Sequence, residues 1–317
     1  MERIRIFETK GLYRDDFRID GFTFGEGEKT LAIVGSMRGN EGQQLYTCSM
    51  LVKRMKELEE AGRLVKDKQI LIIPSVNPYS MNIRKRFWTI DNTDINRMFP
   101  GYDLGETTQR IAAGVFNAVK DFRFGIQFAS FYMRGNFVPH VRMMKTGFED
   151  TEHAKEFGIP YIMIRNPRPF DTTTLNYNWQ IWDCSAFSLY TTDTESVNRK
   201  SSAEAVKAIE RFMIAEGILI KDHEETEEEP VSHVMISDSD LITVRSKHAG
   251  FIEIFARAGT YIDAGEKLAV ITDTLTAEVL EEICAPSSGM IIFSHNDDLA
   301  YANTALFKIA SAQSKAL

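Results

Sequence analysis

The chain has 317 residues, of which 44% are hydrophobic and 26% charged, and its formal net charge at pH 7 is -8. This composition is typical of a soluble globular protein with one large domain or two smaller ones, and it excludes a wholly disordered chain or a fibre. The acidic charge argues against nucleic-acid binding. No apolar run reaches the roughly 18 residues of a membrane helix, and the first residues lack the apolar stretch of a signal peptide, so we expect a cytoplasmic protein that does not bind membranes.

Charge is unevenly distributed along the chain. Residues 1–220 carry 30 Lys and Arg against 28 Asp and Glu, whereas the remaining residues carry 7 against 17. Between these parts, KDHEETEEEP contains no apolar residue and ends in proline, a pattern typical of a solvated linker. We therefore predict a carboxypeptidase-like α/β domain at 1–220, an acidic linker at 221–235 and a small β domain at 236–317.

Strand-like and helix-like runs alternate in the first part. Short apolar runs predict strands at 30–35, 69–74, 124–130, 160–164 and 186–191. Apolar residues three or four positions apart predict helices after Glu41, at 106–122 and at 201–217, the last with a serine cap and a closing glycine. This alternation indicates a mainly parallel or mixed sheet with helices on both faces, whose ligands bind at the carboxyl ends of the strands.

The last part has short apolar runs separated by glycine-rich turns, which predicts an all-β barrel or sandwich. It is reminiscent of biotinyl and lipoyl barrels. The hairpin that carries the modified lysine in those barrels corresponds to TDTLTAEVLEE, which has no lysine. We therefore expect this β domain to be unmodified.

Polar runs follow several of the predicted strands. GSMRGNE at 35–41 is either an ordinary turn or part of a site, and the arginine-rich run at 77–101 is either a solvated loop or an anion site, since arginine suits carboxylates and phosphates. His140 is either a structural residue or a ligand. The aromatic segment 172–196 is either a pocket wall or a core patch. No P-loop, GxSxG or HExxH motif occurs.

Taken together, these runs resemble the succinylglutamate desuccinylase/aspartoacylase family, a branch of the zinc carboxypeptidase-like fold. The resemblance is carried by GSMRGNE, by DINRMFPG after an Asn-Pro turn, and by IQFAS followed by NFVPHVRM. It implies zinc-assisted hydrolysis of an amide bond in a small anionic acyl-amino acid or peptide-like substrate. It also implies that Glu41 is a zinc ligand, that Arg86 polarises the scissile carbonyl, and that Asn96 and Arg97 hold the substrate carboxylate.

The sequence departs from the family at three positions. Arg38 and Ala129 stand where the family has its zinc-binding histidines, and Tyr190 stands where it has its general-base glutamate, with Glu195 close by in the sequence. A guanidinium has no free lone pair and stays protonated, so the zinc site that the family implies is degenerate here. Arg38 is expected to pair with Glu41 instead. An alternative metal site would combine Glu41 with His140.

Two functions follow from this pattern. The first is a hydrolase of the family type, and the alternative is a non-catalytic ligand-binding or regulatory module (a pseudoenzyme) that keeps the anion-binding residues, Arg38 and Arg142 among them. Metal-independent catalysis by Tyr190 or Asp193 is a third interpretation. All three involve a small anionic ligand, and assembly into a homo-oligomer stays open. Each requires Arg38, Glu41, Ala129 and Arg97 to meet at one cavity.

Overall fold

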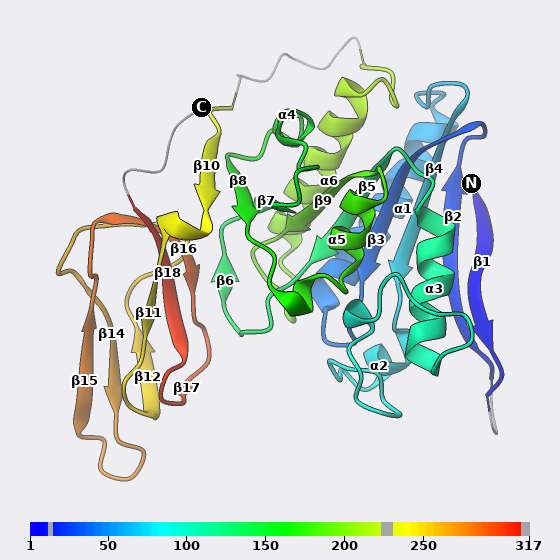
Figure 1. The fold of residues 1–317 in the computed structure, drawn as a ribbon. Helices are drawn as coiled ribbons and strands as arrows, with labels where there is room; N and C mark the ends of the chain where they lie inside the picture. The colour runs from blue at the N-terminus through cyan, green and yellow to red at the C-terminus, as the bar shows by residue number, and fades with distance from the viewer. Residues whose placement is uncertain (12–14, 223–230, 312–317) are drawn as a thin grey trace.

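The computed structural model describes residues 1–11, 15–222 and 231–311. Its larger part is one sheet of nine strands, in the order β1-β2-β4-β3-β5-β9-β7-β8-β10 (Figure 1). These strands are β1 (Glu2–Thr9), β2 (Phe17–Phe24), β3 (Glu28–Ser36), β4 (Lys68–Ser75), β5 (Phe124–Ala129), β7 (His140–Met144), β8 (Tyr161–Arg165), β9 (Ser185–Tyr190) and β10 (Val234–Ser237).

Parallel pairing in the middle of the sheet brings several strand ends to one edge. β4, β3, β5 and β9 pair in parallel, whereas β1 and β2 are antiparallel at one side and β7 pairs antiparallel with β9. The carboxyl ends of β5 and β9 meet, with Ala129 opposite Tyr190. The mixed sheet confirms the predicted α/β fold, and its carboxyl edge is where such sheets bind ligands.

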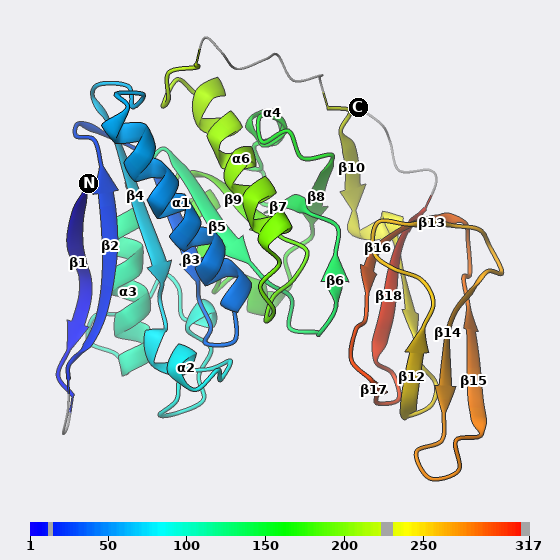
Figure 2. The ribbon, with the colours of Figure 1, turned by 180° about the vertical axis from the view of Figure 1, so that it is seen from behind.

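Helices cover both faces of this sheet (Figures 1 and 2). On one face, Leu51 of α1 and Phe212 of α6 share a buried cluster with Ile33. On the other, Val115 of α3 and Trp179 of α5 share a second cluster with Val34. Neighbouring residues of β3 therefore enter different cores, as the alternation of a strand requires. The helices are α1 (Gly42–Glu60), α2 (Pro78–Asn82), α3 (Thr107–Val119), α4 (Thr151–Lys155), α5 (Leu175–Ile181) and α6 (Arg199–Ala215), with short 3₁₀ turns η1 (Ile95–Arg97) and η2 (Pro169–Asp171).

The helix α6 begins earlier than the sequence predicts. The side chain of Asn198 accepts a hydrogen bond from the backbone N–H of Ser201 at 3.0 Å, so the predicted serine cap is wrong. Asparagine caps helices as well as serine does, and the sequence offers both within one turn. The predicted closing glycine is confirmed, because Gly217 follows the helix with a φ of +64°.

The C-terminal part consists of two sheets. One contains β11 (Leu241–Arg245), β18 (Ala305–Ser311), β16 (Gly289–Ser294) and β13 (Tyr261–Ile262); the other contains β15 (Val279–Cys284), β14 (Lys267–Thr272), β12 (Gly250–Ile254) and β17 (Leu299–Ala300). Leu268 of β14 and Phe307 of β18 share one buried cluster. The β-rich region is as predicted, but a closed barrel is wrong. In the described residues no pairing joins the two sheets, and β13 and β17, at two of the edges, are only two residues long.

The two parts are joined by strand pairing and packing. The short strand β6 (Asn136–Phe137) pairs with β16, and the rings of Phe137 and Phe293 stack with centroids 4.8 Å apart. Beyond the acidic run, part of which lies outside the described residues, β10 pairs in parallel with β8. The predicted boundary at 235 and 236 therefore falls inside a strand of the large sheet. At this junction, Ala310 of β18 shares a buried cluster with Met163 of β8. No helix in the described residues is long and apolar enough to cross a membrane.

Candidate functional site

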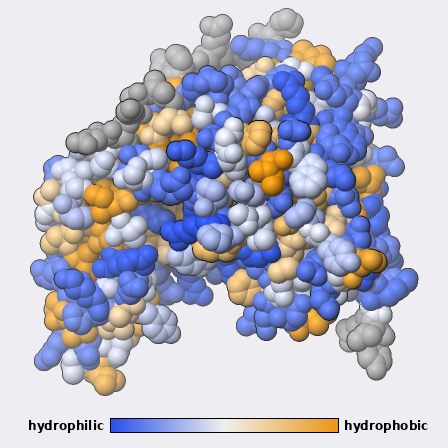
Figure 3. All heavy atoms as spheres, viewed as in Figure 1, coloured by the Kyte–Doolittle hydropathy of each residue, from blue (hydrophilic) through white to orange (hydrophobic). Residues whose placement is uncertain are grey.

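A cavity of about 190 Å³ lies at the carboxyl edge of the large sheet, where the C-terminal part meets it. Hydrophilic side chains surround the hollow between the two parts in the space-filling view (Figure 3). The lining is strongly cationic, because eight basic side chains reach it but only two carboxylates do. The basic residues are Arg38, Arg86, Arg97, Arg142, Arg165, Arg168, Arg245 and Lys308, and the acidic ones are Asp171 and Asp238. A cavity with this lining favours anionic ligands.

Arg38 lies at the inner end of the cavity between two carboxylates. Its Nη1 donates to Glu41 Oε1 at 3.0 Å, and its Nη2 donates to Asp94 Oδ2 at 2.9 Å. Glu41 also accepts hydrogen bonds from the hydroxyl of Ser130 and from the backbone N–H groups of Met37 and Arg38. Arg38 is 5% exposed and Glu41 1% exposed, so this network is shielded from water.

The charges in this network stabilise one another. Burial alone would lower the pKa of Arg38, but the carboxylates of Glu41 and Asp94 raise it above its usual value. Burial alone would raise the pKa of Asp94, but Arg38 lowers it. Arg38 and Asp94 therefore stay charged at neutral pH, and carboxylates contact the buried guanidinium of Arg38 on two sides.

Arg38, Glu41 and Ala129, at which the sequence predicts a degenerate zinc site, do not form a zinc donor set in the structure. The Arg38 guanidinium has no free lone pair, Ala129 has no donor atom, and both oxygens of the Glu41 carboxylate already accept hydrogen bonds. Across the described residues, no three His, Cys, Asp or Glu side chains lie close enough together to hold a metal ion.

Beside this network, Arg86, Asn96 and Arg97 present donors to the cavity. Asn96 is anchored because its Oδ1 accepts a hydrogen bond from the backbone N–H of Leu175, which leaves its amide nitrogen as a donor. Arg97 approaches Asp171 at 3.8 Å, whereas Arg86 forms no ion pair with any carboxylate that the structure describes. Burial and the nearby Arg38 lower the pKa of Arg86 to about 10, although Glu41 and Asp94 partly oppose this effect. Arg86 is therefore still charged at pH 7, and no carboxylate of the described residues lies within 4.0 Å of its guanidinium.

Tyr190 forms the floor of the cavity between two side chains of β7. Its ring stacks on His140 with centroids 4.4 Å apart, and the guanidinium of Arg142 lies 4.5 Å from the Tyr190 centroid. Burial raises the pKa of Tyr190, although Arg142 opposes this effect. The phenol is therefore protonated at neutral pH and suits hydrogen-bond donation better than the abstraction of a proton.

His140 is fully buried beneath the cavity lining. Its Nδ1 lies 2.9 Å from the carbonyl of Val138, and its Nε2 has no hydrogen-bond partner. Burial lowers its pKa to about 3, so the folded protein holds the ring neutral. The unfolded chain binds an extra proton here below its pKa of roughly 6.5. This histidine therefore stabilises the fold fully only above that pH, and its contribution is lost as the pH falls towards 3.

Replacing His140 by phenylalanine, which keeps a ring beside Tyr190, is expected to reduce the acid dependence of stability. Between about pH 6.5 and 5, the unfolding free energy of the parent should fall faster than that of H140F, by up to about 1.4 kcal/mol per pH unit. Urea unfolding at several pH values measures both slopes. His248→Phe removes an exposed histidine and serves as the control. Parallel slopes for H140F and the parent would refute the buried neutral ring.

The structure brings most of the predicted site residues together. Three of the residues that we expect at one cavity line it: Arg38, Ala129 and Arg97. The fourth, Glu41, does not line the cavity but accepts a hydrogen bond from Arg38. Arg86, Asn96, Arg142 and Tyr190 line it as well. Glu195 lines a neighbouring cavity, with Asp193, and accepts a hydrogen bond from Asn40 at 2.9 Å. His140 contacts Tyr190 but does not line the cavity.

Several lining residues were not singled out from the sequence. Ser130 directly follows Ala129, and Arg168 lies in a turn-rich run, NPRPFD, that resembles the arginine-rich run chosen as a candidate. Asp94 was part of that run, but its pairing with Arg38 was not predicted. Lys308 lies in the strand run ALFKIA, and no local pattern marks it. It reaches the site only through the junction of the two parts.

Comparison with known families identifies the class to which this fold and site belong. The catalytic domain of the succinylglutamate desuccinylase/aspartoacylase family matches residues 27–213, which is more than half of the chain. The protein is therefore a member of this family. Among curated proteins, the N-alpha-acetyl-L-2,4-diaminobutyric acid deacetylase of Halomonas elongata is 23% identical over 265 residues, covering 78% of this chain and 72% of that protein.

Solved structures share the whole architecture. A succinylglutamate desuccinylase from Silicibacter sp. TM1040 superposes with a TM-score of 0.78 at 21% identity, over 93% of this chain and 89% of that chain. The product-bound ectoine utilization protein EutE (DoeB) from Ruegeria pomeroyi gives a TM-score of 0.76 at 19% identity, over 96% and 98%. The likeness covers both parts of the fold, including the C-terminal sheets.

Proposed function

We propose that this protein binds a small carboxylate-bearing ligand of the acyl-amino acid type in the cationic cavity, and that it does not hydrolyse this ligand by zinc chemistry. The observation that carries the proposal is the Arg38–Glu41–Asp94 network. This network pairs Arg38, which the resemblance puts in place of a zinc-binding histidine, with two carboxylates, while Arg86, Asn96 and Arg97 line the cavity beside it. Membership of a family named for acyl-amino acid substrates supports the ligand class.

The cavity offers each part of such a ligand a partner. Arg97 and the Asn96 amide would hold the carboxylate, since charge-assisted hydrogen bonds to arginine are strong and directional. Arg86, which forms no ion pair with a carboxylate in the described part of the chain, would donate to the acyl carbonyl. Tyr190 would donate its hydroxyl at the position where the family has a base. These four groups bind and orient the ligand, and none of them is a proton acceptor at neutral pH.

Calorimetry with N-acetyl-L-aspartate, N-acetyl-L-2,4-diaminobutyrate and N-succinyl-L-glutamate tests the proposal, together with the metal content of protein purified without chelator. We expect binding of one or more of these ligands, no release of the free amino acid, and no stoichiometric zinc. Arg97→Met should weaken binding by roughly ten- to hundredfold, because a hydrogen bond to a charged group contributes about 1.5–3 kcal/mol.

Arg123→Met is the matched control, because Arg123 is exposed and pairs with Glu216, away from the cavity. It should bind like the parent. Equal affinity of R97M and R123M, or failure of all three ligands to bind, would overturn the assignment of the cavity. Stoichiometric zinc with hydrolysis that is lost in Glu41→Gln would instead establish a metallohydrolase.

A further inference from the structure

We propose that β1 is an interface at which two copies of this chain pair edge to edge, antiparallel, about a two-fold axis. The pairing places Arg5 of one copy opposite the partner's Glu8 and joins the two large sheets into one continuous sheet. Such an interface is self-complementary, because the same strand serves both copies. The proposal concerns assembly and does not depend on which ligand the cavity binds.

The strand β1 is an open edge of the large sheet. It comes first in the strand order, and among the described residues it pairs only with β2. Figures 1 and 2 show it at the end of the sheet that lies away from the C-terminal part. With eight residues it is the longest edge strand that the structure describes. The unpaired N–H and C=O groups along such an edge can accept a further strand.

A bulge in β1 determines which face each side chain takes. The register with β2 shifts between Arg5 and Phe7, so Ile6 is an extra residue in the strand. Ile4, Ile6 and Phe7 therefore pack against the same buried cluster, the one that contains α3 residues. Strand alternation puts Arg5 and Glu8 on the opposite face. The bulge thus leaves an arginine and a glutamate, three positions apart, on one face.

This pattern allows β1 to pair with itself. Side chains directly opposite each other in neighbouring strands share a face of the sheet. In an antiparallel pair whose two-fold axis passes between Ile6 and Phe7, Arg5 lies opposite the partner's Glu8. Ile6 then lies opposite the partner's Phe7. Both pairs match in face, charged with charged and apolar with apolar, and the bulge is what makes this match possible.

Charges alternate across the proposed junction. Within one copy, Arg5 donates a hydrogen bond to Asp20 of β2, and Arg18 of β2 donates to Glu8 at 3.1 Å. Pairing Arg5 with the partner's Glu8 therefore produces a row of four strands in which the sign of the charge changes at each step. The row begins at Asp20 and ends at the partner's Arg18, and the two-fold axis repeats it. Opposite charges directly across neighbouring strands stabilise the pairing, whereas like charges destabilise it.

The other open edges offer no such match. The strand β15 has six residues, and pairing it with itself along its full length sets Glu281 opposite the partner's Glu282, two like charges. The strand β10 has four residues and β11 has five. Thr243 and Arg245 of β11 line the cavity. Length and charge together therefore favour β1 as the edge that receives a second copy.

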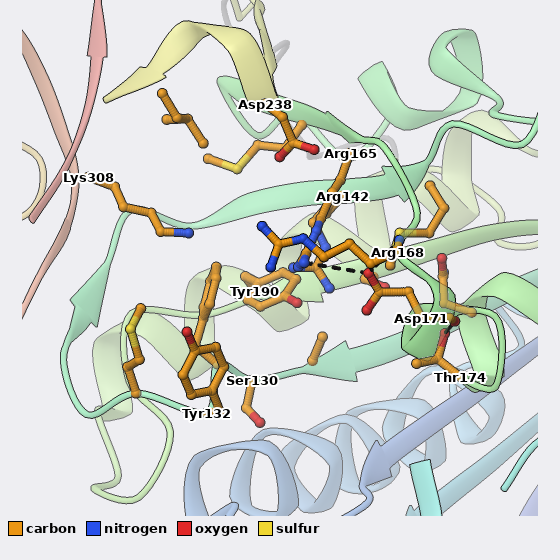
Figure 4. A pocket seen from close by; sticks show the side chains of 18 of the residues that line it. Ser130, Tyr132, Arg142, Arg165, Arg168, Asp171, Thr174, Tyr190, Asp238 and Lys308 are labelled. Carbon is orange, nitrogen blue, oxygen red and sulfur yellow. Dashed lines mark hydrogen bonds and ion pairs between the residues drawn. The ribbon is translucent and has the colours of Figure 1, made fainter. Parts of the chain in front are cut away.

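The proposed interface lies away from the cavity. Arg142 and Tyr190, which are labelled in Figure 4, come from β7 and β9, whereas β2, β4 and β3 separate β1 from β5. Substitutions in β1 should therefore change assembly and leave ligand binding at the cavity as in the parent. Failure of the pairing and failure of the proposed function are for this reason distinguishable.

Two charge reversals test the pairing by sedimentation velocity of the full chain over a range of micromolar concentrations. The parent should form a dimer. In a homodimer of Arg5→Glu or of Glu8→Arg, like charges would lie opposite each other at both symmetry-related pairs. Each variant should therefore dimerise more weakly, by roughly tenfold or more. In an equimolar mixture of R5E and E8R, opposite charges again lie across the interface, so the mixture should recover most of the affinity as a heterodimer.

Lys267→Glu is the matched control for these reversals. Lys267 is an exposed cation that pairs with Glu282 of the neighbouring strand at 2.8 Å, in the C-terminal part. Its reversal should leave the dimer as in the parent. Hydrogen exchange of the parent gives a second measurement that needs no variant. The β1 amides should exchange more slowly in concentrated than in dilute protein, because some of them donate to the partner strand.

A parent that stays monomeric would overturn the proposal, and so would a dimer that forms equally well in R5E, E8R and K267E. Exchange of the β1 amides that is the same in dilute and concentrated protein would also exclude β1 as the interface. If the mixture of R5E and E8R dimerises no better than either variant alone, Arg5 does not face the partner's Glu8 and the proposed pairing is wrong.

Discussion

Replacing Arg38 by methionine is expected to lower the free energy of unfolding by about 3–5 kcal/mol at neutral pH, because it leaves two buried carboxylates without their cation. Glu41 is 1% exposed, and the side chain of Asp94 is 14% exposed. Methionine fills a similar volume, so lost packing contributes little. Chemical unfolding of R38M and the parent at pH 7 measures the difference.

The pH dependence identifies the cause of this loss. In the parent, Arg38 holds the pKa of Asp94 below its usual value, so this pair stabilises the fold above roughly pH 4 and the contribution is lost as the pH falls further. In R38M the burial of Asp94 is no longer opposed by Arg38, so the pKa of Asp94 should be raised and its carboxylate should take up a proton on folding. The deficit of R38M relative to the parent should therefore shrink as the pH is lowered from 7 to about 5.

Arg54→Met is the matched control for R38M. Arg54 also makes two hydrogen bonds to one carboxylate, that of Glu210, but its side chain is 38% exposed. An exposed pair of this kind contributes at most about 1 kcal/mol. A cost for R38M no larger than that for R54M would show that the buried network does not stabilise the fold as we infer.

The sequence predicted the α/β fold because its signals are local. The apolar runs that became β3, β4, β5 and β9 are buried on both faces of the sheet, and such strands stand out from any polar surroundings. The start of α6 was missed, because Ser201 and Asn198 are both good caps and the choice between them depends on packing. Whether the C-terminal strands close into a barrel or stay as two sheets depends on long-range pairing that no local pattern records, and in the described residues they stay as two sheets.

The same distinction holds for the site. The pairing of Arg38 with Glu41 could be predicted because the two residues lie three positions apart in the turn that leads into α1. Asp94 lies 56 residues away, and its contact with Arg38 exists only because the loop after α2 folds back to the edge of the sheet. Lys308 reaches the cavity from another sheet. The sequence shows which residue types are present, but it does not show which distant segments come into contact. The positions of Asp94 and Lys308 at the site were missed for this reason.

Introducing two histidines, Arg38→His together with Ala129→His, is expected to create a zinc site. Ala129 lines the cavity, and the next residue, Ser130, already contacts Glu41, so a histidine at 129 would lie beside that carboxylate. A histidine at 38 would be next to Asp94, which could accept its second N–H and orient the ring. Two imidazoles and one carboxylate are a ligand set that zinc enzymes use.

Metal analysis after incubation with zinc and desalting measures the outcome, with the thermal shift on zinc addition as a second readout. We expect about one equivalent in the double variant, less in either single variant and none in the parent. Adding Glu41→Gln to the double variant should weaken binding, because the anionic ligand is lost. Retention of zinc by the parent at the level of the double variant would show that Arg38 does not exclude the metal. Absence of zinc from the double variant would mean that side chains at positions 38, 41 and 129 do not converge on one point, and the assignment of these positions to a zinc site would then have to be abandoned.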